Sequence, residues 1–205
     1  MTPRPMRARH PAILAAAVEV TRERGLEHTS MNDVAERAGT NASSVLYWLA
    51  SKPELLTIAL TAAEESFYRE LEAALAKLGS ARERMVRLIE AATGWGDYEA
   101  ALWIDLWSRA LRDEEHAGVR EQLDERWRRT ISAVVAEGQQ AGEFGRGDPD
   151  ELGLLLGALM DGFAVQIALG DQTGTPERAR DLCLRVAGRE LDCELCAPER
   201  SPALR

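Results

Sequence analysis

Residues 42–52 bring hydrogen-bonding groups of several kinds into one short stretch of chain. The sequence ASSVLYWLASK places three serine hydroxyls, a tyrosine hydroxyl, an indole N–H and an ammonium group there. A serine hydroxyl can donate to or accept from a base edge, and the Tyr, Trp and Lys donors suit phosphate oxygens. The alternative is that Tyr47 and Trp48 pack inside the protein, because aromatic residues at helical spacing are more often core residues.

Residues 95–107 mix bulky rings with carboxylates. Three of the five tryptophans and one tyrosine fall there, together with Glu99 and Asp105. Rings and acids together can bind a cation. The alternative is that Trp103 and Trp107, four residues apart, are ordinary core residues on one helix face. The candidate ligand-binding residues are Trp95, Trp103, Asp105, Trp107 and Asp161.

Catalytic and metal chemistry find little support in the sequence. Cys193 and Cys196 have the spacing of a metal or redox pair, but no second pair and no nearby histidine completes four ligands. No glycine-rich phosphate loop and no nucleophile with a linked base can be assembled. We therefore predict a protein that is not an enzyme and has no cofactor or metal. The odd number of cysteines does not resemble a disulfide framework, which fits a reducing compartment.

Composition and charge indicate a soluble protein with two electrostatically different parts. The chain has 205 residues and a net charge of −9. Residues 1–60 hold 7 Lys and Arg against 6 Asp and Glu, and residues 61–205 hold 18 against 28. There is no run of 18 or more apolar residues and no secretory signal, so we expect the bacterial cytoplasm. The first ten residues hold three arginines and no acid, typical of a mobile arm that binds a polyanion or simply solubilises the terminus.

The N-terminal part is predicted to form three short helices, over residues 11–24, 31–38 and 42–50. Ser30 and Asp33 match a capping box at the start of the second helix, and Gly39 permits a left-handed turn after it. Val45 and Leu49 define the buried side of the third helix, which directs Ser43, Ser44 and Tyr47 outward. Two short helices around a glycine turn form a helix-turn-helix, whose second helix enters the major groove of DNA.

The rest of the chain also has helical periodicity and no useful strand pattern. A second capping box, Ser51 with Glu54, starts a long fourth helix. Further helices are predicted over residues 80–94, 97–113, 119–142, 149–170 and 176–191. The fold class is therefore all-α, with about nine helices.

Residues 29–56, TSMNDVAERAGTNASSVLYWLASKPELL, resemble the DNA-binding domain of the tetracycline-repressor (TetR) family of regulators. The chain departs from the family pattern at Leu46, where a Tyr is usual, and at Leu49, where Phe is frequent. The resemblance implies a DNA-binding domain over residues 1–55, with Ser43, Ser44 and Trp48 near base edges or phosphates and Tyr47 and Lys52 on the backbone. The implied DNA-binding residues are Ser30, Asn32, Ala42, Ser43, Ser44, Tyr47, Trp48 and Lys52.

Two later segments, LWIDLWSRALRDEE and AGEFGRGDPDELGLLLGALMDGFAVQ, resemble the C-terminal domain of the choline/betaine-type branch of that family. The resemblance implies a ligand-binding and dimerisation domain over residues 56–195, followed by a disordered tail, 196–205. Three glycines between residues 152 and 169 make one side of an apolar helix thin enough for the helix of a partner chain to approach closely. The alternative is that this helix is buried inside its own domain. The implied dimer-interface residues are Leu152, Leu156, Leu159, Phe163, Leu182 and Val186.

These features predict a homodimeric, ligand-responsive repressor that binds a palindromic operator on double-stranded DNA. Its effector is expected to be a small molecule, cationic or aromatic, and no membrane partner is expected. The competing hypothesis is a protein-interaction module that kept this fold and lost DNA binding, for which Leu46 and the low basicity would be the evidence.

Overall fold

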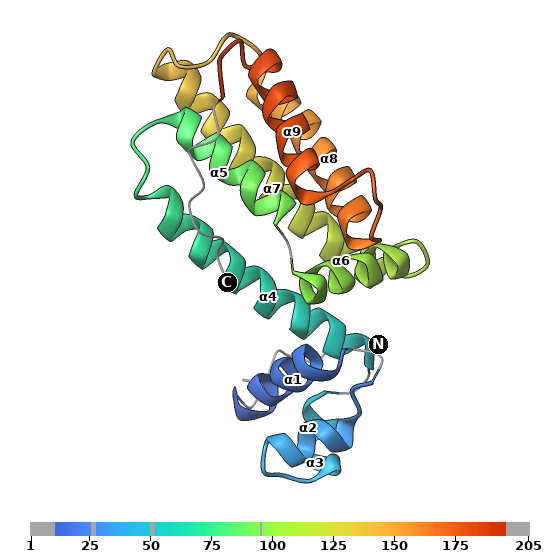
Figure 1. Ribbon diagram of the computed structural model, residues 1–205. Helices are drawn as coiled ribbons and strands as arrows, with labels where there is room; N and C mark the ends of the chain where they lie inside the picture. Colours follow the sequence, from blue (N-terminus) through green and yellow to red (C-terminus); the bar gives the residue numbers. More distant parts are fainter. Residues whose placement is uncertain (1–10, 26–27, 50–51, 95, 196–205) are drawn as a thin grey trace. The chain divides into compact units, whose positions relative to one another are not determined.

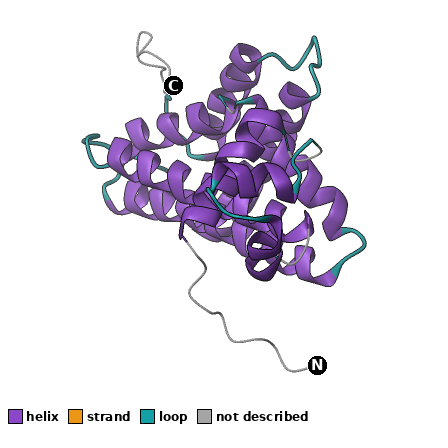
Figure 2. Ribbon diagram, turned by 90° about the horizontal axis from the view of Figure 1, so that it is seen from below, coloured by secondary structure: helices purple, strands orange, loops and turns teal. Residues whose placement is uncertain are grey.

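The computed structural model describes residues 11–25, 28–49, 52–94 and 96–195 (Figure 1). Within these ranges every regular element is a helix, and Figure 2 shows no strand. The chain divides into two compact units, Met1–Ser66 and Phe67–Arg205, and the division falls inside the helix α4, Lys52–Leu75. The predicted all-α fold is confirmed. The predicted cationic arm and C-terminal tail lie outside the described residues.

The first unit contains α1 (Pro11–Arg24), α2 (Met31–Arg37) and α3 (Ala42–Trp48) before α4 begins. Its core consists of small and medium aliphatic side chains that are almost fully removed from water, among them Val20, Val34, Val45, Leu49 and Leu56. Each such burial contributes about 1.5–3 kcal/mol relative to exposure. Short helices of this length are not stable alone, so this shared core holds α2 and α3 in place.

Local capping fixes where α2 and α3 begin. The backbone N–H of Asp33 donates to Ser30 Oγ at 3.2 Å, and the Ser30 N–H donates to the Asp33 carboxylate at 2.9 Å, which confirms the predicted capping box. Gly39 adopts φ 64°, the left-handed conformation that glycine tolerates best. Asn41 then caps α3 by accepting from the Ser44 N–H at 2.9 Å. The predicted box at Ser51 falls on a residue outside the described ones.

The second unit holds five further helices: α5 (Ala81–Thr93), α6 (Asp97–Ala110), α7 (Glu114–Gln140), α8 (Pro149–Ala168) and α9 (Pro176–Glu190). In Figure 1, α5, α7, α8 and α9 run side by side as a bundle. The core lies between them and is built from Met85, Ile89, Ile131, Leu156 and Met160, with other apolar residues around.

The helix α7 begins earlier than the periodicity predicted. It starts at Glu114 instead of residue 119. Asp113 is the N-cap: one carboxylate oxygen accepts from the Glu115 N–H at 3.1 Å, and the other contacts His116 Nδ1. The first turn is polar even where it is buried, at His116, so an apolar pattern does not reveal the start of the helix, which the Asp113 cap stabilises.

Two glycines of α8 allow close packing inside this chain. A Cβ on Gly153 would lie 2.2 Å from Ser132 Oγ and 3.1 Å from the Arg128 carbonyl oxygen, both on α7. A Cβ on Gly157 would meet Ile131, Arg128 and Trp127 of the same helix at 3.6–3.9 Å. The helix that packs closely against these two glycines is therefore α7. A Cβ on Gly162 would have no atom within 4 Å.

Candidate functional site

The helix α3 separates buried from exposed side chains as its periodicity predicts. Val45 and Leu49 are fully buried, whereas Leu46 is 51% and Tyr47 is 55% exposed. Ser43 is exposed and Ser44 is partly exposed beside them. The exposed face of α3 thus combines hydroxyl groups with two large side chains. Such a face can form hydrogen bonds and apolar contacts in a groove that admits a helix.

Of the two aromatic residues on α3, Tyr47 is not a core residue. The rings of Tyr47 and Trp48 meet edge to face, with centroids 5.1 Å apart and planes at 89°. Trp48 is partly buried and supports Tyr47, whose exposure rules out the alternative of an internal packing role for that ring. The contact with Trp48 therefore restrains the Tyr47 ring, and the phenol group of Tyr47 is exposed.

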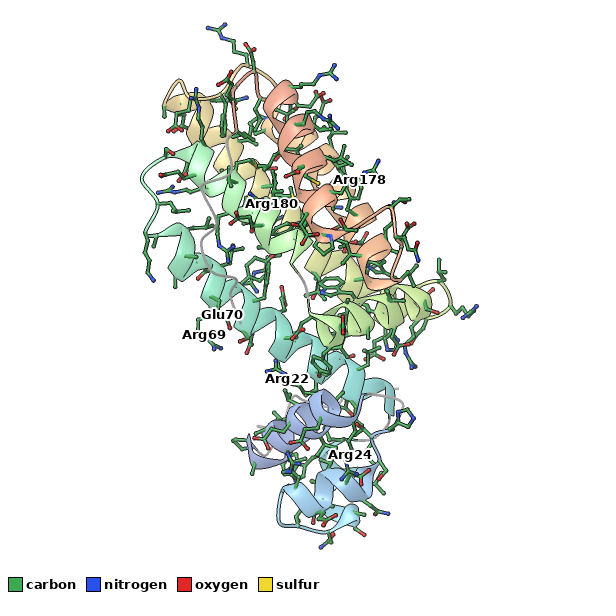
Figure 3. All side chains as sticks on the ribbon, viewed as in Figure 1. Arg22, Arg24, Arg69, Glu70, Arg178 and Arg180 are labelled. Atoms are coloured by element: carbon green, nitrogen blue, oxygen red, sulfur yellow. The ribbon has the colours of Figure 1, made fainter. Side chains whose placement is uncertain are left out.

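The arginines around α2 are engaged with carboxylates. Arg24, labelled in Figure 3, contacts the Asp33 carboxylate at 2.5 Å. Arg37 contacts Glu23 at 2.5 Å and Glu19 at 3.1 Å. Hydrogen bonds from Ser30, with Arg24 close by, lower the pKa of Asp33, and the bond from Arg37 lowers the pKa of Glu23. These cations are partly neutralised, so they offer less to a polyanion than their number suggests.

The remaining DNA-binding residues implied by the resemblance differ in how accessible their side chains are. The Ser30 hydroxyl is committed to the cap of α2, because it also donates to the Asp33 carboxylate at 2.6 Å. Asn32 is exposed and Ala42 is partly exposed. The Lys52 side chain lies outside the described residues. Sequence reasoning treated Leu46 as a lost aromatic contact and missed that it shares the exposed face with Ser43, although their spacing of three residues indicates it.

In the second unit, the tryptophan cluster of α6 is compact but its carboxylate is already paired. The rings of Trp103 and Trp107 are 6.2 Å apart between centroids, and both are partly buried. Arg109 Nε donates to both oxygens of Asp105 at 3.0 Å. Trp95 lies outside the described residues. Asp105 is therefore a weaker anchor for a cation than its position in the sequence indicated.

Asp161 on α8, unlike Asp105, has no arginine paired with it among the described residues. It makes no hydrogen bond or ion pair with any described residue. Burial is the main cause that raises its pKa to about 7; the nearby charge of Asp124 on α7 acts in the same direction, and Arg128 opposes both with a smaller effect. Asp124 does have a partner, Arg120, although burial also raises its pKa. A partly buried carboxylate without a partner is costly, and a bound cation would reduce that cost.

An aromatic side chain packs against α8 one helical turn before this carboxylate. Trp127 of α7 lies 3.9 Å from the Cβ position of Gly157, one helical turn before Asp161. The Trp127 ring meets Phe67 edge to face, with centroids 6.0 Å apart. Its indole N–H is buried and has no hydrogen-bond partner among the described residues. We refer to Asp161, Asp124 and Trp127 as the α7–α8 acidic cluster.

An open cavity of about 680 Å³ lies elsewhere on the second unit, between α4, α5 and α7. Residues along it are Leu75, Arg84, Gln122, Glu125, Arg126, Arg129, Thr130, Ala133, Val134 and Glu137. None of the candidate ligand-binding residues lines it. Three arginines and two glutamates lie along it: Arg84 pairs with Glu137 at 2.5 Å, Arg129 pairs with Glu125 at 2.7 Å, and Arg126 is the third arginine. A lining with an excess of arginine does not favour a cation, so we favour the α7–α8 acidic cluster.

The outer side of α8 is apolar. Leu154 is 55% and Leu155 is 46% exposed, whereas Leu152 and Leu156 point into the core of their own unit. The 18-residue window of highest hydropathy in α8 averages 1.4, which is enough by composition to cross a membrane, and only 28% of that window is buried. A long apolar helix that is mostly unburied needs a cover.

The other implied interface residues surround this surface. Leu159 and Phe163 of α8 and Leu182 and Val186 of α9 are partly buried. On α9, Figure 3 shows Arg180 toward α5, where it approaches Glu90 at 3.8 Å, and Arg178 on the other side. Arg178 precedes Leu182 by four residues, so it lies on the same face as the two α9 candidates.

Comparison with known proteins agrees with this arrangement of two units. Residues 13–57 match the model of bacterial regulatory proteins, tetR family. Residues 81–192 match the model of the BetI-type transcriptional repressor, C-terminal. No curated protein matches the chain in sequence.

Solved structures share the fold. A transcriptional regulator from Saccharomonospora viridis in complex with choline is 27% identical, with a TM-score of 0.73 over 84% of this chain and 92% of that one. A TetR transcription regulator from Haloarcula marismortui is 22% identical, with a TM-score of 0.73 over 91% and 97%. The regulator FadR from Bacillus subtilis in complex with stearoyl-CoA is 19% identical, with a TM-score of 0.66 over 86% and 96%.

Proposed function

Because this chain belongs to the TetR family of bacterial regulatory proteins, with a BetI-type C-terminal part, we propose that it is a homodimeric repressor released from its operator by a small organic cation. Its DNA-binding domain and its ligand-binding domain make it a transcriptional regulator. In the bacterial cytoplasm, two copies of the chain would bind a palindromic operator together.

The observation that supports operator binding is the exposed face of α3. Ser43 and Ser44 would approach base edges, where a hydroxyl can donate or accept. Tyr47 and Lys52 would contact phosphate oxygens, and Trp48 would hold the Tyr47 ring or reach a phosphate itself. One helix of this length reads few base pairs, so a two-fold dimer with helices roughly 34–36 Å apart would read a near-palindrome.

The outer side of α8 supports the dimer. Leu154 and Leu155 expose apolar surface between α8 residues that are only partly buried, and this surface continues toward Leu159 and Phe163. A second copy of the same helix would cover it by two-fold symmetry, with α9 contributing Leu182. Burying such leucines is worth about 1.5–3 kcal/mol each before the entropy of association is subtracted.

The α7–α8 acidic cluster supports a cationic effector. A cation beside Asp161 would pair with a carboxylate that forms no hydrogen bond or ion pair with any described residue, and it would lie near the ring of Trp127. The Saccharomonospora viridis relative was solved with choline, an organic cation. Release would require the cation to favour a dimer whose recognition helices are wrongly spaced, and a tenfold loss of affinity needs about 1.4 kcal/mol of coupling.

A binding experiment with matched ligands tests this proposal. The duplex enriched from a random library by the full chain would be titrated by fluorescence anisotropy with and without choline. Its neutral isostere 3,3-dimethylbutanol serves as the control, because it has the same shape without the charge. We expect choline to weaken DNA binding and to raise the melting temperature, with no effect of the isostere. Stronger responses to the isostere or to an anion such as stearoyl-CoA would reject a cationic effector.

A further inference from the structure

Leu46 is an apolar side chain on the exposed face of α3. It is 51% exposed on α3, and the core side of that helix is already completed by Val45 and Leu49. At 100° per residue, Leu46 lies on the same face as Ser43, three residues before it, and next to Tyr47. The fold therefore does not need Leu46 where it stands.

A single exposed leucine is common and calls for no explanation by itself. Its position sets Leu46 apart. Among the described residues of the first unit, the large apolar side chains that are substantially exposed are Leu46 and Tyr47, neighbours on α3. The Tyr47 hydroxyl can contact a phosphate, but a leucine has no donor for one. Leu46 can therefore favour a DNA site only through an apolar contact.

We propose that Leu46 selects thymine at one position of each half-site by contact with its 5-methyl group. This inference rests on the proposed operator binding. The methyl group of thymine is the apolar group that base edges present in the major groove, and aliphatic side chains contact it. Cytosine would place an amino donor opposite Leu46 instead, and that donor would lose water without gaining a partner. Leu46 thus contributes sequence preference, whereas Tyr47 contributes affinity for any DNA.

Deoxyuridine provides the test, because it differs from thymidine by that methyl group alone. Each thymine of the enriched duplex would be replaced by deoxyuridine in one half-site, one at a time. Binding of the wild-type chain and of Leu46→Ala would be measured by fluorescence anisotropy. At one position we expect about a fourfold loss for the wild type, the ratio that corresponds to burying one methyl-sized group. At that position the Leu46→Ala variant should change by less than about twofold.

Leu111→Ala is the matched control. Leu111 is 82% exposed at the end of α6, so this change also shortens an exposed leucine, but the wild-type response to deoxyuridine should persist. Melting temperatures of both variants should stay close to that of the wild type, because neither side chain is buried. Equal responses of wild type and Leu46→Ala at every thymine would overturn the inference. Failure to enrich any duplex would instead reject operator binding, and this inference with it.

Discussion

Asp161→Asn should stabilise the protein, and the gain should grow as pH rises from 5.5 to 8.5. The amide has the shape of the carboxyl group but no charge to bury. Burial and the charge of Asp124 raise the pKa of Asp161 from 3.8 to about 7. The wild type must therefore hold a costly charge in its folded state above neutral pH, and the variant need not.

The sign and size follow from proton linkage. Between pH 3.8 and about 7 the folded chain keeps the Asp161 proton that the unfolded chain has lost, so the free energy of unfolding falls as pH rises. One pKa unit corresponds to 1.36 kcal/mol, so the interval from pH 5.5 to about 7 costs the wild type about 2 kcal/mol. Above that range the difference is constant. For a chain of this size, the advantage of the variant in melting temperature should grow by about 4–8 °C.

Thermal unfolding at the two pH values, followed by circular dichroism, measures this growth. Asp105→Asn is the matched control, since it removes the same charge from an ion pair with Arg109. That variant should lose less than about 1 kcal/mol and show no growth with pH. A gain for Asp161→Asn that is equal at both pH values, or a loss at both, would refute the reasoning. Choline should stabilise the wild type and not Asp161→Asn if the same carboxylate serves the effector.

Three further predictions concern DNA, the dimer and the packing of α8. Tyr47→Ala and Lys52→Ala should weaken binding to all duplexes in anisotropy titrations, and Lys52→Ala should lower the salt slope by about one; unchanged affinity in both would reject the anchoring roles. Leu155→Arg should dissociate the dimer at micromolar concentration in sedimentation, whereas Leu111→Arg should not; a monomeric wild type would exclude the dimer. Gly153→Ala should cost about 1–3 kcal/mol in denaturant unfolding, because its Cβ would meet α7, while Gly162→Ala should gain up to about 1 kcal/mol; equal effects would contradict this packing.

Features that depend on neighbours in the chain could be predicted from the sequence. The Ser30–Asp33 capping box and the buried pair Val45 and Leu49 involve residues three or four apart, and both are present. The start of α7 was missed because its first turn is polar. The pairing of Asp105 with Arg109 also has helical spacing, four residues, and the sequence could have revealed it.

Features that depend on which helix faces which could not be predicted. Gly153 could have faced a partner chain or its own, and only the packing of α7 against α8 decides for its own. Leu152 and Leu156 were predicted to lie in the interface, whereas in the structure they are buried and Leu154 and Leu155 are the exposed leucines. A nearly continuous apolar run does not distinguish a core stripe from an interface stripe, because both exclude water.

The helix α8 has three sides that differ in their surroundings, and this suggests how binding of the proposed effector would be transmitted. Leu156 and Met160 fill the core, Asp161 opposes Asp124 of α7, and Leu155 is exposed on the outer side. A cation that compensates Asp161 would change the balance of charge between α7 and α8, where Gly153 already allows a close approach. Close-packed helices shift as rigid bodies, so a displacement of α8 on its inner side would move its outer leucines as well. The cost of an unpaired Asp161 is then the source of the coupling, because the unliganded chain retains a strain that the effector relieves.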